Sequence, residues 1–445
     1  MPAEPTSTHP EPDIAIIGAG PAGLVTALRL HQHGIRPTIY ETVPELKPLG
    51  VGVDIKTVGT AELEGLGLLD EFRAISVDAE DSIFFNHYGQ EIYAEKCGVH
   101  MGYLHEQRFV HRGILQMLFY RTVIERLGAD AIRLGAGVTG YTQDADGVTL
   151  EIVGRDGRLE HVRHDAVIAA DGINSAIRRR MHPSQAEPHF SGITMWRGTT
   201  LREPIRGGHT ICHIGDPTIS SMIVYPIAEN FEGSGLDLIN WVVETNGEET
   251  IEDWNQVGDI TDVIPLYDSV KIPFLDVQQL MRDAREVYLF PLIRHDALDN
   301  WVDGRVALMG DAAHAMYPRG GNGITQAMID ARVIVEQLVA HPLDPHAAFV
   351  AFDAARRVPV NRIVENMRGE GYEVIRRIVA DRTDHQPFDD IEQVLPLAEA
   401  DEIFSKYHSL VGSPRPGRAA GEATGFRTGD ALTGDTLTGT PEAAR

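Results

Sequence analysis

An acidic residue and a glycine-rich turn give one region of the chain the groups needed to hold a charged cofactor. Residues 306–309 are apolar and predict a short buried strand, and Gly310-Asp311, the Gly-Asp motif, follows it. The Gly-Gly-Asn-Gly segment at residues 320–323 follows, and a helical pattern begins at about Gly323. A helix start behind a glycine turn directs unpaired N–H groups at one point, where they favour an anion, while a carboxylate can accept hydrogen bonds from hydroxyl groups. The pattern suits an anionic cofactor that carries a polyol, although many ordinary strand-to-helix connections share it.

The N-terminal region carries the pattern of a dinucleotide-binding turn. Residues 14–17 predict a buried parallel strand, and an apolar stripe over residues 24–30 predicts a helix that ends near Gly34. A second strand at residues 38–40 ends in Glu41, whose carboxylate stands at the spacing expected for a ribose hydroxyl. The glycines serve the tight turn and the close approach of a pyrophosphate. The residues predicted to contact the cofactor here are Gly18, Gly20, Pro21, Ala22, Gly23 and Glu41.

A second match to the glycine pattern, at residues 135–140, stands in a different context. A turn at residues 144–147, strand-like residues 148–153 and another turn at residues 155–157 follow it. Because no helix can begin there, we interpret the segment as the edge of a β-meander. Val138 would contribute at most backbone contacts to an adenine.

Composition and charge exclude several classes of protein. The 445 residues are 43% hydrophobic, which allows a large core, and the length suggests about two or three units. The net charge of −26, from 39 basic and 65 acidic residues, argues against nucleic acid as a partner. No apolar run approaches the roughly 20 residues of a membrane span, and residues 1–12 lack a signal-peptide core. We therefore predict a cytoplasmic protein. The two cysteines, Cys97 and Cys212, are far apart in sequence, so we expect neither a disulfide framework nor a metal site.

A third motif completes the set and carries a family resemblance. An apolar strand at residues 166–170 ends in Asp171-Gly172, and a basic run, residues 178–180, follows. With the three motifs in this order, the chain resembles the single-component FAD-dependent aromatic hydroxylases, the fold group of p-hydroxybenzoate hydroxylase, over roughly residues 13 to 380. Residues 48–53, 111–116, 195–198 and 316–323 are similar to the branch that contains 5-methylphenazine-1-carboxylate 1-monooxygenase. That branch shares the Gly-Asn-Gly of this chain, where most aromatic hydroxylases have Gly-Gln-Gly.

The resemblance implies cofactors and residue roles. In this family NADH or NADPH reduces FAD, O₂ adds to give a C4a-hydroperoxide, and one oxygen passes to an electron-rich aromatic carbon. Asp171 is implied in binding FAD and NAD(P)H, Asp311 in holding the ribityl chain, and the N–H groups of Asn322 and Gly323 in binding flavin N1 and O2. Further residues implied at the cofactor are Arg112, Gln116 and Gly321, and the loop that carries Pro318, Asn322 and Gly323 is implied as the catalytic flavin loop. We interpret the basic run as a solvated helix face, with a landing patch for nicotinamide phosphates as the alternative.

The resulting fold class is α/β: a Rossmann-like FAD-binding domain with an inserted β-sheet substrate domain and C-terminal helices. We place the FAD-binding domain at residues 13–72, 105–190 and 286–380, and the substrate domain at residues 73–104 and 191–285. Residues 381–411 are expected to be helical, and residues 1–12 and 412–445 to be disordered because they are poor in apolar residues. Strand-like runs at residues 192–200, 220–225 and 238–244 predict a sheet laid over the flavin ring.

The function that follows is hydroxylation of an aromatic or heteroaromatic small molecule. Trp196, Tyr225 and Tyr317 are candidates for the substrate side, although a single aromatic residue at such a position is more often part of the core. We assign no protein acid or base and interpret His314 as packing the Gly-Asp turn. Two alternatives stay open: the same flavin chemistry with a Baeyer–Villiger or decarboxylative outcome, and a non-catalytic flavin-binding protein. The sequence does not indicate the oligomeric state.

Overall fold

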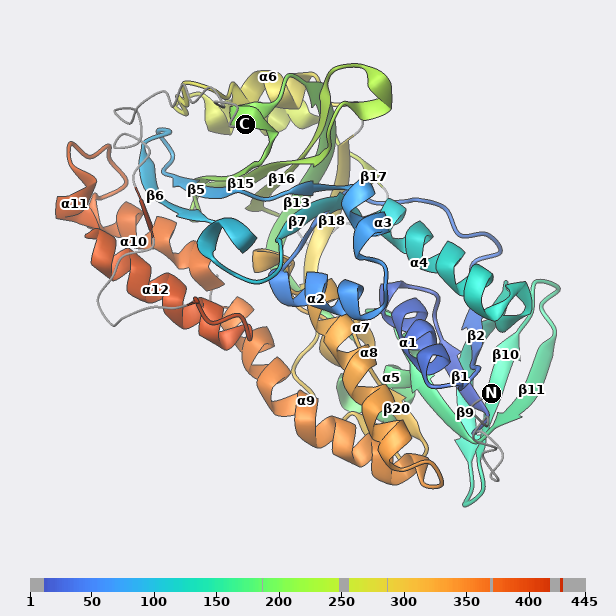
Figure 1. Cartoon of the computed structure of the whole chain (residues 1–445). Coiled ribbons are helices and arrows are strands. Elements are labelled where there is room, and N and C mark those ends of the chain that lie inside the picture. The colour runs from blue at the N-terminus through green and yellow to red at the C-terminus, as the bar shows by residue number, and fades with distance from the viewer. Residues whose placement is uncertain are drawn as a thin grey trace, which may run out of the picture.

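A computed structural model describes residues 12–185, 187–247, 256–285, 287–368, 371–416 and 425–426. The remainder of the segments predicted to be disordered, residues 1–11, 417–424 and 427–445, lies outside the described residues. Helices and sheets are mixed in three regions: a nucleotide-motif region, a large sheet and a C-terminal group of helices (Figure 1). The predicted α/β fold class is confirmed.

A six-stranded sheet joins the three motifs. Its order is β19 (Val302–Asp303), β20 (Val306–Leu308), β12 (Ala166–Ala169), β1 (Ile14–Ile17), β2 (Thr38–Glu41) and β8 (Ile132–Leu134). All neighbours pair in parallel except β19 with β20. Because the carboxyl ends of parallel strands meet at one edge, the turns that follow β1, β12 and β20 lie beside one another there.

Helices cover this sheet, which explains why β1 and β12 are continuous apolar strands. Helix α1 (Pro21–Gln32) packs against α4 (Arg112–Leu127) and α8 (Gly323–Ala340), and α8 packs against α9 (Pro345–Arg368). The helix predicted from the apolar stripe over residues 24–30 and the helix start predicted at Gly323 are confirmed. The shorter helices are α2 (Thr57–Gly65), α3 (Leu69–Ala74), α5 (Ala176–Met181) and α7 (Asp311–His314).

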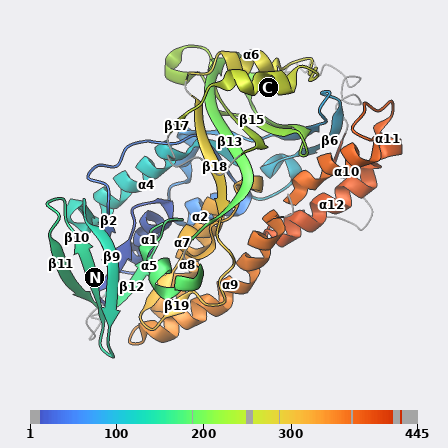
Figure 2. The same cartoon turned by 180° about the vertical axis from the view of Figure 1, so that it is seen from behind.

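Two three-stranded sheets complete this region. One is the meander β9 (Gly137–Gln143), β10 (Val148–Val153) and β11 (Leu159–His164), seen at the lower left of Figure 2. Val138 is buried in β9 opposite Ile152, so the second glycine match is a strand edge, as interpreted from the sequence. The other sheet has the order β3 (Gly52–Ile55), β7 (Arg108–His111) and β4 (Ser76–Asp78).

A nine-stranded sheet forms the second large layer. Its order is β17 (Gln256–Val257), β18 (Val287–Arg294), β13 (His189–Arg202), β16 (Asp237–Asn246), β15 (Ser220–Ala228), β14 (Thr210–Asp216), β5 (Asp81–Phe85), β6 (Glu91–Lys96) and β21 (Gly425–Phe426). The three runs predicted as strands fall within β13, β15 and β16. Since β18 belongs to the same sheet, sheet membership continues past residue 285, and the proposed domain boundaries stay a prediction.

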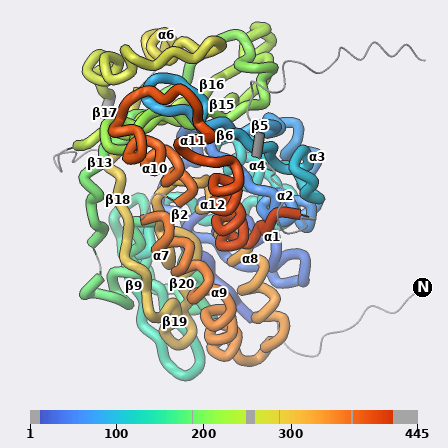
Figure 3. The backbone as a smooth tube through the Cα atoms, turned by 90° about the vertical axis from the view of Figure 1, so that its left-hand side faces the viewer, coloured from blue at the N-terminus to red at the C-terminus, as the bar shows by residue number. Residues whose placement is uncertain are grey.

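The two faces of this sheet are covered by different segments. Helix α6 (Val277–Arg282) packs on one face, where Trp241 and Met281 belong to one apolar core. Helices α10 (Val374–Arg382), α11 (Ile391–Val394) and α12 (Leu397–Leu410) lie on the opposite side, in front of the sheet in Figure 3. Phe84 and Phe404 pack together in this second core.

The start of the predicted disordered tail requires a correction. Residues 412–416 are described, Ser413 and Arg415 are buried, and the backbone of β21 pairs with β6. The composition argument failed here because one buried arginine with carboxylate partners anchors a segment that is otherwise poor in apolar residues. Among the described residues, none of the helices combines the length and the apolar character that a membrane crossing needs.

Candidate functional site

A cavity of about 420 Å³ connects the three motifs with the nine-stranded sheet. The turn before α1, the start of α4 and the segment before α8 form one side of it, and strands β13 to β16 form the other. Predicted site residues that line the cavity are Gly20, Pro21, Ala22, Arg112, Asp311, Pro318, Gly321, Asn322, Gly323 and Tyr225. Its volume lies in the range of small-molecule sites, about 300 to 1,000 Å³.

The three glycines of the first turn answer different steric demands. A Cβ at Gly23 would lie 2.0 Å from the carbonyl oxygen of Gly18, so close packing of helix on strand excludes any side chain there. Gly18 has a φ of +100° and sits against the backbone of Ala170. A Cβ at Gly20 would meet no heavy atom within 4 Å, and Gly20 lines the cavity. The turn therefore leaves open space where a ligand backbone or phosphate can approach.

Glu41 and Gln116 hold this turn from two sides. The Glu41 carboxylate accepts hydrogen bonds from Ala19 N–H at 2.7 Å and from Val43 N–H at 2.9 Å. Gln116 Nε2 donates to the Ala19 carbonyl at 2.9 Å. Each Glu41 oxygen retains acceptor capacity, so the carboxylate can fix the turn and still accept from a hydroxyl.

The Asp-Gly motif is tied to the Gly-Asp motif through Arg178. This side chain is 1% exposed and donates to the carbonyl oxygens of Ala312 at 3.2 Å, Ala313 at 3.0 Å and Asp296 at 2.9 Å. Burial lowers the pKa of Arg178 to about 10. The interpretation of the basic run as a solvated face is therefore wrong for Arg178, although residues 179 and 180 are exposed.

Asp171 itself lies behind the cavity. Its Oδ2 accepts a 3.4 Å hydrogen bond from Ile177 N–H at the start of α5. Burial raises the pKa of this carboxyl, and its Oδ1 has no hydrogen-bond partner among the described residues. The neighbouring Gly172 and Ala170, not Asp171, line the cavity.

A buried network fixes the Gly310 turn against α8. The Asp330 carboxylate, fully buried, lies 2.5 Å from His314 Nε2 and 2.7 Å from Arg356 Nε, and accepts from Gly310 N–H at 3.2 Å. His314 is thus structural, as interpreted from the sequence. Asp311 is the first residue of the short helix α7, and its exposed side chain lines the cavity.

Residues 318–323, the glycine loop, form the floor of the cavity. Gly320 and Gly321 have φ values of +75° and +66°. A Cβ at Gly323 would meet no heavy atom within 4 Å, and the N–H groups of the first turn of α8 have no partner inside the helix. The Asn322 side chain instead points away from the cavity, since its Nδ2 donates to Tyr407 Oη at 2.7 Å and to the Gly320 carbonyl at 3.2 Å.

Two of the three aromatic residues predicted on the substrate side do not line the cavity. Trp196 bonds to Thr245 Oγ1 and packs beside the core under α6, and Tyr317 packs in the core that contains Leu292. Successive side chains of a strand point to opposite faces, so on β13 it is Arg197 that faces the cavity. Tyr225 lines the cavity as predicted and packs against Phe109 with ring centroids 5.0 Å apart.

The charges around the cavity are unevenly paired. Glu244 binds Arg319 at 2.8 Å, and Asp54 binds Lys56 at 2.6 Å. Arg197 takes part in none of the ion pairs recorded among the described residues; its Nη2 makes a 3.4 Å contact with a carbonyl, and its buried Nε has no partner. Burial lowers the pKa of Arg197, but a guanidinium stays charged in proteins.

His213 and Tyr372 also line the cavity, and no sequence pattern indicated either residue. His213 is 1% exposed, with Nδ1 2.7 Å from Glu373 Oε1 and Nε2 3.3 Å from Ser82 Oγ. Both ring nitrogens are engaged, so His213 acts as a fixed wall. Only the folding of β14 against the segment before α10 brings these residues together.

Residues 11–354 match the family described as the FAD binding domain. The chain belongs to this family. It is 34% identical over 412 residues to the phenazine 1,6-dicarboxylic acid hydroxylase of Lysobacter antibioticus, an alignment that covers 91% of this chain and 98% of that protein. It is 29% identical to a 3-amino-4-hydroxybenzoate 2-monooxygenase of Streptomyces platensis, over 81% of this chain and 88% of the relative. The chain is accordingly a flavin-dependent monooxygenase of the FAD-dependent aromatic hydroxylase group.

Solved structures show the same fold. A single-residue variant of Klebsiella pneumoniae HpxO in complex with FAD matches with a TM-score of 0.74 at 21% identity, covering 91% of this chain and 100% of that one. The cavity fits FAD on its own evidence: open space at Gly20 and Gly323, two helix starts that favour anions and an arginine, Arg112, at the start of a third helix. FAD is therefore the cofactor of this chain.

Proposed function

We propose that this chain uses NAD(P)H and O₂ to hydroxylate an aromatic or heteroaromatic carboxylate. The overall reaction converts Ar–H, O₂, NAD(P)H and H⁺ into Ar–OH, NAD(P)⁺ and water. When bound, FAD supplies the chemistry that carries electrons from the nicotinamide to O₂. The chain's residues bind, orient and shield the reactants.

The observation that carries the substrate class is Arg197. Its half-buried guanidinium faces the cavity, its buried Nε has no partner, and the nearby carboxylates of Glu244 and Asp54 are already paired with Arg319 and Lys56. A charge that is largely removed from water and has no ionic partner is costly, whereas a planar guanidinium can bind a carboxylate through two parallel hydrogen bonds. An aromatic acid supplies the missing partner.

The remaining cavity walls support orientation of a flat ring. Ile211, Ile223 and Val242 add apolar surface beside Tyr225, so the ring is held in a site that excludes water. Exclusion of water favours productive oxygen transfer over release of H₂O₂. The N–H groups at the start of α8 are suited to stabilise negative charge on the flavin pyrimidine edge.

The cofactor roles proposed from the sequence fit the same geometry. Arg112 begins α4 at the cavity and suits the pyrophosphate, Asp311 suits the ribityl hydroxyls, and Glu41 suits a ribose hydroxyl. Use of NAD(P)H is consistent with the predicted cytoplasmic location.

The experiment measures NAD(P)H consumption and product mass with matched ligand pairs. Phenazine and benzoate carboxylic acids are compared with their methyl esters, in wild type and in Arg197→Met. We expect acids to stimulate NAD(P)H consumption and to gain one oxygen atom. We expect Arg197→Met to raise KM for acids by at least about tenfold, which corresponds to the loss of a charged hydrogen bond.

The matched control is Arg202→Met, on the same strand β13 but outside the cavity lining. If esters serve as well as acids in wild type, the carboxylate assignment fails; a product that has lost CO₂ would instead support the decarboxylative alternative.

A further inference from the structure

The glycine loop is held from behind by a residue near the end of the described chain. Tyr407, on α12, receives the Asn322 Nδ2 hydrogen bond at 2.7 Å, and its Oη lies 3.4 Å from the Gly320 carbonyl oxygen, to which it can donate. Tyr407 is 6% exposed, and burial raises its pKa to about 12. The phenol therefore stays protonated, and it bridges both ends of the Gly320–Gly321–Asn322 turn.

The loop and the phenol are fitted closely to each other. A Cβ at Gly320 would lie 2.0 Å from Tyr407 Oη, so the hydroxyl occupies the space that any side chain at this position would need. On the loop's other side, a Cβ at Gly321 would lie 3.1 Å from Asp54, whose carboxylate is fixed by Lys56 at 2.6 Å and by Gln107 at 2.9 Å. The loop thus lies between β3 and α12, with little room to shift.

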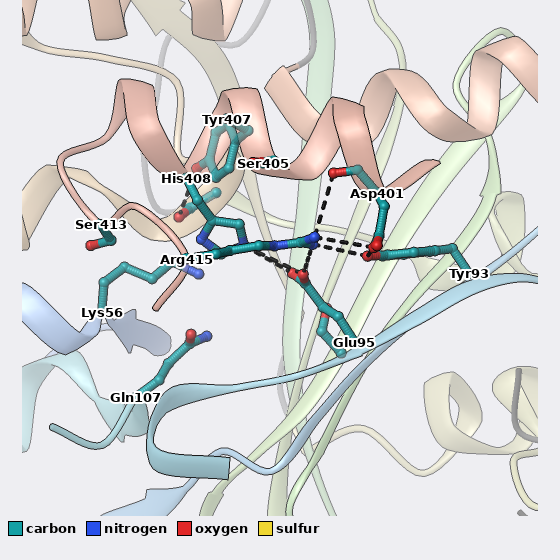
Figure 4. Close-up of polar contacts among 12 residues, drawn as sticks. Lys56, Tyr93, Glu95, Gln107, Asp401, Ser405, Tyr407, His408, Ser413 and Arg415 are labelled. Carbon is teal, nitrogen blue, oxygen red and sulfur yellow. Dashed lines mark hydrogen bonds and ion pairs between the residues drawn. The ribbon is translucent and has the colours of Figure 1, made fainter. Parts of the chain in front are cut away.

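Helix α12 is itself anchored by the segment that follows it. Figure 4 shows the Arg415 side chain inserted between α12 and β6, where it binds Asp401 at 3.1 Å, Glu95 at 2.5 Å and Tyr93 Oη at 2.9 Å. His408, the neighbour of Tyr407, lies 3.2 Å from Glu95. This buried cluster fixes α12 on both sides of Tyr407, and so it fixes the position of the phenol relative to the glycine loop.

We propose that Tyr407 is a positioning residue of the flavin site, which holds the glycine loop so that the N–H groups of Asn322 and Gly323 face the flavin pyrimidine edge. The inference rests on the proposed placement of the flavin over this loop. Tyr407 does not line the cavity; it acts through the Asn322 side chain and the Gly320 carbonyl. Because those N–H groups stabilise negative charge, loosening the loop should weaken the binding of reduced FAD more than the binding of oxidised FAD.

The test is Tyr407→Phe, which keeps the ring and removes the hydroxyl. The matched control is Tyr267→Phe, which also removes the hydroxyl of a fully buried tyrosine, one that bonds Ser220 Oγ at 2.6 Å in the core beneath α6, outside the cavity lining. FAD affinity of the apoprotein and the flavin midpoint potential are measured with wild type and both variants. We expect Tyr407→Phe to raise the Kd of oxidised FAD about threefold and to raise the Kd of reduced FAD by a further factor of about five. At about 30 mV per tenfold for two electrons, the midpoint potential should fall by about 20 mV.

A second measurement separates positioning from general loss of stability. In an Asn322→Ala background the 2.7 Å partner of the phenol is gone and the 3.4 Å contact with the Gly320 carbonyl is what remains, so Tyr407→Phe should change FAD affinity and potential less than it does in wild type. Equal FAD affinity and equal potential in Tyr407→Phe and Tyr267→Phe would overturn the proposal, as would additive effects in the double variant. Both readouts need FAD but no aromatic substrate. A failure of the hydroxylation proposal, seen as absence of substrate-stimulated NAD(P)H consumption in wild type, is therefore distinguishable from a failure here.

Discussion

Replacement of Asp330 by asparagine should release the turn at Gly310 from α8. In wild type the buried carboxylate lies 2.5 Å from His314 Nε2 and 2.7 Å from Arg356 Nε, and it accepts from Gly310 N–H at 3.2 Å. Removing one partner of a buried ion pair costs about 3 to 5 kcal/mol, because the other charge is left uncompensated. The asparagine oxygen can keep one of the three contacts. We therefore expect Asp330→Asn to lower the free energy of unfolding by about 3 kcal/mol, the lower end of that range.

The same network predicts how acid affects wild type. Burial favours the neutral carboxyl, but the charges of His314 and Arg356 outweigh it and lower the pKa of Asp330 from 3.8 to about 2. A group whose pKa is lower in the folded state contributes stability above its unfolded pKa, and this contribution is lost as the pH falls from 3.8 towards 2. At about 1.4 kcal/mol per pH unit, the interval corresponds to about 2.5 kcal/mol. Asp330→Asn should lose this part of the acid dependence.

Urea unfolding of the apoprotein, at about pH 7 and at about pH 3, measures both effects. The FAD affinity of the same protein preparations is measured as well, because the turn at Gly310 carries Asp311 to the cavity. The control is Glu336→Gln on the same helix, whose pair with Arg332 at 2.9 Å is solvent-exposed and should be worth less than about 1 kcal/mol. An Asp330→Asn variant as stable as Glu336→Gln, with wild-type FAD affinity, would refute the reasoning.

Three further predictions concern the cofactor. Glu41→Ala should weaken FAD binding by about 1.5 to 3 kcal/mol, because the hydrogen bond to a charged acceptor is lost. Fluorescence titration of the apoprotein measures this affinity, and an unchanged affinity would show that Glu41 does not bind the ribose. Arg112→Ala should weaken FAD by a similar amount, about 1.5 to 3 kcal/mol, whereas Arg121→Ala, on the exposed side of the same helix, should leave the affinity as it is. Asp311→Ala should mainly release FAD, whereas Gly323→Val should slow flavin reduction or increase the fraction of O₂ released as H₂O₂ beyond any loss of affinity. If Gly323→Val is reduced and hydroxylates normally, the flavin ring does not lie over the glycine loop.

The cofactor half of the site could be predicted because its information is local in sequence. The turn at Gly18, Gly20 and Gly23 is specified by steric demands within one strand–helix unit, and Glu41 follows at the end of the next strand. Helix periodicity likewise identified the start of α8 at Gly323. Each of these features needs only a short stretch of chain, so propensity and spacing were sufficient.

The substrate half could not be predicted in the same way. On β13 a pattern of alternating residues does not say which face meets the cavity, and the prediction favoured the aromatic Trp196 over its charged neighbour Arg197. The basic run after Asp171 showed a similar ambiguity, because the burial of Arg178 depends on carbonyls contributed by residues 296, 312 and 313. In both cases the partner group, distant in sequence, decides the role of the side chain.

Tyr407 is the clearest instance of that dependence, and it bears on how the site is built. The hydroxyl meets Asn322 across 85 positions of sequence, and the helix that carries it is fixed by Arg415, in a segment whose composition predicts no packing at all. Gly320 in turn is required because the phenol occupies the place of a side chain. The local sequence explains Gly320 by the turn alone, whereas in the structure the Tyr407 hydroxyl also excludes a side chain at this position. The glycine loop therefore owes its shape to its own sequence and its position to the C-terminal part of the chain.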